Sequence, residues 1–175
     1  VLSYNTKQDI IDKCGGPARH VEFLLQDSVD DNLQWKDTIS PNHPLKKVCD
    51  YVDEWLSGRH TSKNQSFNLG DKLIGLTEAP FGLFQSYAPM AMVAFAMRKY
   101  VNIIFDTNGK QRTAQHLVED VVELFKAWEN GKTNNKLNFI FESKEAGRVC
   151  KSLIRMFNLN KLKGYSDISS LKDAR

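Results

Sequence analysis

The sequence is short of the features that mark secreted and membrane proteins. It has three cysteines among 175 residues, and an odd number of widely spaced cysteines does not make a disulfide framework. No apolar run approaches the roughly 18 residues that a membrane-spanning helix needs. These absences exclude a disulfide scaffold and favour reduced thiols. We therefore expect a cytoplasmic location and no membrane partner.

An excess of charge of one sign is also lacking. The chain has 24 basic and 21 acidic residues, which leaves a net charge of +3. A total this small does not identify a nucleic-acid-binding protein. Hydrophobic residues make up 41% and charged residues 26%, which is ordinary for a folded globular protein and argues against general disorder and a fibrous protein.

Motifs of catalytic and metal sites are equally scarce. The segment Gly131-Lys132-Thr133 resembles the end of a phosphate-binding loop, but Lys126 stands where that loop needs its first glycine. Neither a G-x-S-x-G nor a G-x-G-x-x-G pattern is present. Two Cys/His pairs lack the spacing that places both ligands on one zinc ion: Cys14 with His20, and His43 with Cys49. We therefore expect no catalytic residue, no bound metal and no cofactor.

Apolar residues at helical spacing predict three helices in the first 60 residues. The clearest begins at Pro44 and ends at Leu56, because its apolar residues follow the i, i+3, i+4, i+7 pattern. Thr6 can cap a shorter helix, and Pro17 can begin another. The polar segment 57–71 is typical of a linker. We predict a helical subdomain over residues 1–60.

Residues 61–175 mix predicted strands with predicted helices. Extended segments are expected at 72–76, 101–106 and 137–142, and helices at 89–100, from Thr113 to Trp128, and from Ser143. Asn108-Gly109 predicts a tight turn. We predict an α+β fold, mainly helical, with helices packed on a small two- to three-stranded sheet. A winged-helix-like arrangement is one candidate for this second subdomain, 61–175.

Two of these helices have informative faces. The helix over residues 90–100 is rich in Ala and Met and apolar nearly all round, which predicts a central, buried position. The helix after Thr113 is expected to turn an apolar face inward that includes Leu117, Val118, Val121, Phe125 and Trp128.

Positive charge is concentrated in the second subdomain. Residues 1–60 carry 7 basic and 10 acidic side chains, whereas residues 61–175 carry 17 and 11, which supports a boundary near residue 60. Four cations are spaced i, i+4, i+7 and i+11 and would form one stripe on a helix: Lys144, Arg148, Lys151 and Arg155. Lys161 and Lys163 continue the charge, and Lys110 and Arg112 follow the Asn108-Gly109 turn. This pattern is typical either of a solvated helix face or of a surface that neutralises phosphates.

The two ends of the sequence favour a fragment of a larger protein. The chain starts at Val1 without a methionine and stops at Arg175, just after a serine that can cap a new helix. If this interpretation holds, the parent protein can carry a catalytic site that this chain lacks.

One stretch resembles a known module. Glu78-Ala79-Pro80-Phe81-Gly82-Leu83 is followed by Pro89 opening an Ala-rich helix, then by Ile103-Ile104-Phe105-Asp106 and Asn108-Gly109. Residues 73–142 in this order resemble an accessory module of large bacterial multidomain ATPases of phage-defence (BREX-like) or DNA-repair type. There a Pro-Pro-Tyr-Gly-Leu turn precedes an apolar helix, a strand and a glycine turn. Ala79 and Phe81 depart from that turn, and no catalytic residue carries over.

Within this turn the residue types predict packing. Pro80 restrains the chain, and Gly82 allows an unusual φ. Phe81, Leu83 and Phe84 can cover apolar surface beside the buried helix, and the alternative is a groove that binds a partner.

Three hypotheses about function follow. The leading one is a non-catalytic interaction domain of a larger intracellular bacterial protein, an ATPase in defence or DNA repair, which contacts other domains or subunits. The second is a winged-helix module that binds DNA through the basic stripe. The third is a small enzyme whose site is assembled from distant residues.

Overall fold

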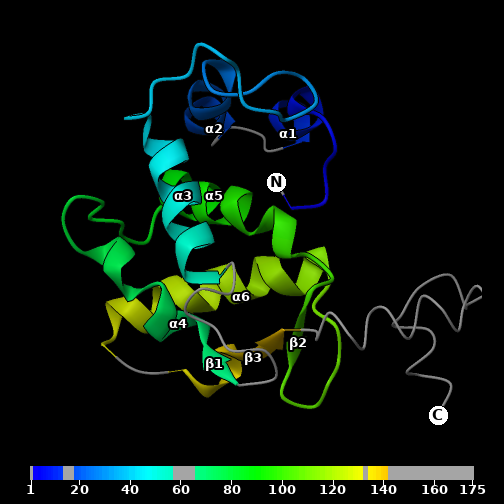
Figure 1. Cartoon of the computed structure of the whole chain (residues 1–175), viewed down its shortest axis with the longest axis vertical. Helices are drawn as coiled ribbons and strands as arrows, with labels where there is room; N and C mark the ends of the chain where they lie inside the picture. Colours follow the sequence, from blue (N-terminus) through cyan, green and yellow to red (C-terminus); the bar gives the residue numbers. More distant parts are fainter. Residues whose placement is uncertain (1, 14–17, 57–65, 132–133, 142–175) are drawn as a thin grey trace, which may run out of the picture.

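The computed structural model describes residues 2–13, 18–56, 66–131 and 134–141 (Figure 1). In chain order its elements are α1 (Lys7–Lys13), α2 (Ala18–Gln26), α3 (Pro44–Leu56), β1 (Phe67–Asn68), α4 (Leu69–Lys72), η1 (Ile74–Thr77), α5 (Tyr87–Met97), η2 (Arg98–Tyr100), β2 (Ile104–Asp106), α6 (Ala114–Glu129), η3 (Asn135–Leu137) and β3 (Asn138–Phe141), where η is a 3₁₀ helix. The predicted fold class is confirmed, since helices predominate and pack on a small sheet. The helix predicted from Ser143 lies outside the described residues.

The sheet has three strands in the order β1-β3-β2, and both neighbouring pairs are antiparallel. Phe67 of β1 lies opposite Phe139 of β3, and Phe105 of β2 lies opposite Ile140. The chain passes from β2 to β3 through α6 rather than through a hairpin. The winged-helix-like arrangement stays a prediction, because residues 142–175 lie outside the described part of the chain.

Helix α5 occupies the centre of the molecule, where it packs against α2, α3 and α6 (Figure 1). Six consecutive residues, Met92 to Met97, are buried, which confirms the position predicted from its uniformly apolar composition. The helix begins at Tyr87 rather than at Pro89. Pro89 is tolerated because the N–H groups of the first turn have no partner within the helix.

The buried side chains of the two predicted subdomains form one hydrophobic cluster. It includes Val48 and Val52 of α3 together with Val93 of α5 and Leu117 of α6. Helix α3, from the predicted 1–60 subdomain, packs directly on α5, from the predicted 61–175 subdomain. Among the described residues, a boundary near residue 60 therefore does not separate two hydrophobic cores.

The segment after residue 65 is more regular than its polar composition suggested. The end of the predicted linker contains β1 and α4, and residues 74–77 form a 3₁₀ helix where an extended stretch was expected. Leu69, Leu73 and Leu76 are fully buried at helical spacing. Asn68 caps α4, because its Oδ1 accepts from the backbone N–H of Asp71 at 3.2 Å. Partners distant in the chain stabilise the segment, so a local pattern could not predict it.

The Asn108-Gly109 turn is confirmed. Gly109 has φ +81°, a conformation that glycine adopts without steric cost. The Asp106 carboxylate accepts from the backbone N–H groups of Asn108 and Lys110, both at 2.9 Å. The strand before the turn is shorter than predicted and covers Ile104–Asp106.

Candidate functional site

The structure separates the two cations of the Asn108-Gly109 turn. Lys110 is exposed, whereas the Arg112 guanidinium donates from Nε and Nη2 to the two carboxylate oxygens of Asp120, at 3.0 and 2.5 Å. Arg112 also lies over the Phe139 ring, 5.6 Å from its centroid. Arg112 is therefore an ion-pair partner within the fold, and the phosphate contact predicted for Lys110 and Arg112 stays a prediction. The other predicted binding residues lie outside the described part: Lys144, Arg148, Lys151, Arg155, Lys161 and Lys163.

Asp120 is the buried member of this ion pair. It is 4% exposed, and burial raises its pKa although the hydrogen bonds from Arg112 act in the opposite direction. The pair joins the segment after β2 to α6. Its role is structural, since both charges are compensated within the molecule.

Cys49 is a core residue, as its position on the apolar face of α3 suggested. The side chain is buried, and burial raises the pKa of the thiol to about 12. A thiol with such a pKa is protonated at neutral pH and therefore a poor nucleophile. Within the described ranges, no three His, Cys, Asp or Glu residues are grouped so that they could hold a metal ion. None of the helices described is both long and apolar enough to cross a bilayer.

Only some side chains of the turn at residues 78–84 pack against the rest of the protein. The Phe81 ring meets the Tyr51 ring edge to face at 5.2 Å, and the backbone N–H of Leu83 donates to the Leu76 carbonyl at 2.8 Å. Gly82 has φ +60°, as expected for a residue that needs an unusual conformation. Phe84, in contrast, is 69% exposed. The prediction that Phe84 covers the core is wrong.

Phe84 lines one of two hollows that share Trp128. A hollow of about 220 Å³ is lined by Leu83, Phe84 and Trp128. A second hollow, of about 190 Å³, is lined by Trp128 and Ile74. Trp128 borders both hollows. We call four of the apolar side chains that line them the Phe84 surface: Ile74, Leu83, Phe84 and Trp128.

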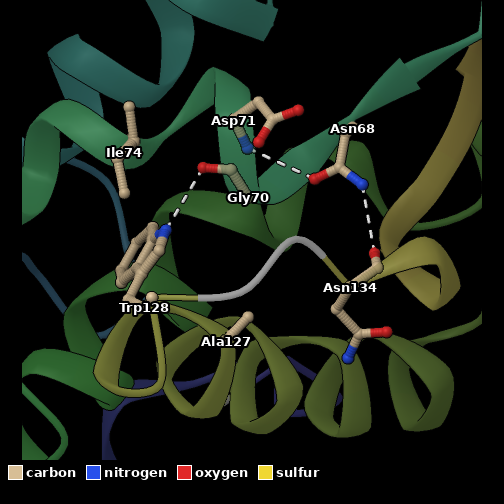
Figure 2. A pocket seen from close by; sticks show the side chains of 8 residues that line it. Asn68, Gly70, Asp71, Ile74, Ala127, Trp128 and Asn134 are labelled. Atoms are coloured by element: carbon tan, nitrogen blue, oxygen red, sulfur yellow. Dashed lines mark hydrogen bonds between the residues drawn. The ribbon is translucent and has the colours of Figure 1, made fainter.

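Trp128 is held firmly in place at the centre of the Phe84 surface. Its indole Nε1 donates to the Gly70 carbonyl at 3.2 Å, as Figure 2 shows. Its ring meets the buried Phe125 ring edge to face at 5.0 Å. The hollows on either side of Trp128 are therefore bordered by a fixed side chain and do not depend on a mobile one.

A polar network borders the second hollow (Figure 2). The Asn68 amide donates from Nδ2 to the Asn134 carbonyl at 3.1 Å and to Asn138 Oδ1 at 2.8 Å, while its Oδ1 caps α4. This side chain uses both of its polar atoms within the fold. The network therefore joins α4 to the segment before β3 and fixes the edge of the hollow.

Charge around the Phe84 surface is acidic. Among the described residues that line its two hollows, the charged ones are Asp71 and Glu129. Neither carboxylate forms an ion pair with a described Lys or Arg. The surface therefore combines apolar side chains with two carboxylates that no described cation pairs with.

Sequence reasoning missed most of this surface. Trp128 was expected on the inner face of α6, and Ile74 in an extended segment, so neither was predicted as a surface residue. The turn motif at 78–83 did point to this place, since a partner-binding groove was its alternative interpretation. Comparison with protein-family models, with curated proteins and with solved structures returned no match.

Proposed function

We propose that this chain is a non-catalytic interaction domain of a larger intracellular bacterial protein, an ATPase of the defence or DNA-repair type, and that the Phe84 surface receives its partner. The exposure of Phe84 beside Trp128 supports this proposal most directly. Contiguous exposed apolar patches on folded proteins mark interaction sites more often than chance, and aromatic side chains dominate interface energetics.

The arrangement of the surface favours a preformed site. Trp128 is fixed by Gly70 and Phe125, and Leu83 is tied to Leu76 through the backbone. A partner that docks here does not have to order these groups. A preorganised surface loses less conformational entropy on binding than a mobile one.

The chemistry of the surface specifies the kind of partner. The hollows beside Trp128 suit an apolar side chain, and the carboxylates of Asp71 and Glu129 suit Lys or Arg on either side of it. Charge complementarity of this kind contributes specificity and speeds association. The partner that fits is a protein segment with apolar residues flanked by basic ones.

Replacing Phe84 by aspartate should weaken binding of such a segment about tenfold or more, because it places a charge on the apolar contact. The measurement is fluorescence anisotropy with two labelled twelve-residue peptides that carry leucine and phenylalanine four residues apart. One has lysine and arginine at its remaining positions, and the other has glutamate. The wild-type chain should bind the basic peptide and not the acidic one.

The chain offers a matched control for this experiment. Phe23 of α2 is 71% exposed, nearly the same as Phe84, and lines neither hollow of the Phe84 surface. Phe23→Asp should leave the affinity unchanged, and Glu129→Gln should weaken binding of the basic peptide. Equal losses for Phe84→Asp and Phe23→Asp, or no binding by the wild-type chain, would contradict the proposal.

The spacing of Lys144, Arg148, Lys151 and Arg155 favours nucleic-acid binding as a second candidate function. Changing Arg148, Lys151 and Arg155 to glutamate should abolish a gel shift with duplex DNA at about 50 mM salt, because phosphate contacts supply the affinity. Wild-type binding should fall steeply as salt increases. Lys110→Glu alone should have a small effect. Absence of a wild-type shift at low salt would exclude this function.

A further inference from the structure

A hollow beside α3 shares no lining residue with the two hollows of the Phe84 surface. Its volume is about 550 Å³, and it is bordered by the N-terminal segment, the loop after α2, α3 and the α5–η2 junction. Volumes of this size are typical of sites for small organic molecules. We call it the Arg98 cleft, after the cation that lines it together with Trp35, Leu33, Asp53 and Asn102.

Arg98 is the unpaired charge of this cleft. One guanidinium Nη donates to the Tyr4 carbonyl at 3.0 Å, and the group lies over the Phe95 ring, 5.4 Å from its centroid. It forms an ion pair with none of the carboxylates in the described ranges. Burial lowers its pKa, in keeping with a cation that has lost solvent without gaining a counter-ion.

The other charges of the cleft are compensated. The Asp53 carboxylate pairs with the Lys99 ammonium group and accepts from the Tyr100 hydroxyl at 3.0 Å. Asp50 pairs with Lys46 at 3.1 Å. Of the cations that line the cleft, Arg98 is therefore the one without a counter-ion in the described part of the chain.

Two aromatic side chains, Trp35 and Phe95, line the same cleft. The Trp35 ring meets the Phe95 ring edge to face at 5.9 Å, and Trp35 remains 38% exposed. The loop that carries it is held by Asp30, whose carboxylate accepts from the backbone N–H groups of Asn32 and Gln34, both at 2.9 Å. The Lys46 ammonium group also lies over the Trp35 ring, 5.6 Å from its centroid. Trp35 can therefore offer its remaining exposed surface, held in a fixed position, to the body of a ligand.

Two residues of this cleft have an unusual backbone conformation. Among the described residues, two that are not glycine have positive φ, Leu33 at 60° and Asn102 at 66°, and both line the cleft. Positive φ is unusual for leucine in particular. Strained residues persist where the surrounding structure fixes them, and they cluster at ligand sites.

We propose that the Arg98 cleft binds a small aromatic carboxylate, with its carboxylate on the Arg98 guanidinium and its ring against Trp35. Arg98 presents a planar donor fork that matches a carboxylate. Arg98 supplies one positive charge that no described carboxylate pairs with, and one charge balances a single carboxylate better than a doubly charged phosphate. This site is independent of the partner surface around Phe84.

The test titrates the full chain with four probes: indole-3-acetate, indole, acetate and phenyl phosphate. Binding is monitored through the NMR signals of the backbone amides and of the tryptophan side chains of the protein. Indole-3-acetate should produce saturable shifts at residues 33–35 and 98–102. Indole or acetate alone should bind at least tenfold more weakly, and so should phenyl phosphate. Arg98→Gln and Trp35→Leu should each weaken indole-3-acetate binding about tenfold.

Controls separate binding from folding. Lys110→Gln, which removes an exposed cation outside the cleft, should leave the affinity unchanged. Arg98→Lys keeps the charge and should retain more affinity than Arg98→Gln if both variants unfold at the wild-type temperature. If Arg98→Gln does not fold, the proposal is tested by the affinity of Trp35→Leu for indole-3-acetate and by the comparison of the four probes on the wild-type chain. Three results would overturn the proposal: no saturable shift at these residues, equal binding of indole and indole-3-acetate, or tighter binding of phenyl phosphate.

Discussion

Replacing Asp120 by alanine is expected to destabilise the protein by about 3 to 5 kcal/mol, because the change leaves a covered guanidinium without its carboxylate. The side chains of Arg112 and Asp120 are 16% and 6% exposed, and the guanidinium lies against the Phe139 ring. Water reaches Arg112 poorly, so solvent cannot replace the two hydrogen bonds that it loses. The measurement is the free energy of unfolding in urea, followed by circular dichroism at pH 7.

The neighbouring residue provides the control for this change. Glu119 is exposed and forms no ion pair with a described cation, so Glu119→Ala should change the free energy of unfolding by about 0.5 kcal/mol or less. Arg112→Met combined with Asp120→Leu should be less destabilised than Asp120→Ala alone, since no unpaired charge remains. A loss below about 1 kcal/mol for Asp120→Ala would contradict the buried ion pair.

Truncating Phe125 to alanine should cost about 3 to 5 kcal/mol, the usual range for a phenylalanine removed from a packed core. Phe125 is 1% exposed, and its ring supports Trp128 at 5.0 Å. The cavity left behind should also release Trp128. We therefore expect lower stability in urea, together with a change in tryptophan fluorescence in the folded state.

Val118 lies on the same helix and serves as the matched control. It is 49% exposed, and Val118→Ala should change the free energy of unfolding by about 0.5 kcal/mol or less. The sequence placed Val118 on the inner face of α6 with Phe125. Similar losses of unfolding free energy for the two variants would indicate that Val118 lies on the inner face of α6. They would also contradict the inference that Phe125 supports Trp128.

The Phe84 surface and the Arg98 cleft differ in what could be foreseen of them. The 78–83 turn indicated one end of the Phe84 surface, and its residue types predicted that Phe81 packs, although not that its partner is Tyr51. The exposure of Phe84 could not be predicted, because apolar residues in a turn have no periodicity that assigns them to a face. The Arg98 cleft gave no sequence signal, since its lining residues come from four segments.

The ion pair between Arg112 and Asp120 shows the same limit for charged residues. By sequence, Arg112 was grouped with Lys110 as a surface cation, because both follow the Asn108-Gly109 turn. The turn itself was predicted correctly, from a dipeptide whose conformation is local. Which of the two cations reaches solvent depended on Asp120 of α6, eight positions after Arg112, and on the Phe139 ring over which Arg112 lies.

The amino-acid sequence by itself determined the mainly helical α+β class, the central position of α5 and the turn at Gly109. Each of these follows from interactions between residues close in the chain, or from an apolar pattern that permits one environment. Only the tertiary structure decided that α3 shares one hydrophobic cluster with α5, that polar residues after position 65 form β1 and α4, and that Phe84 is exposed while Arg112 is paired. Those outcomes depend on partners distant in the chain, whose contacts exist only after the elements have packed.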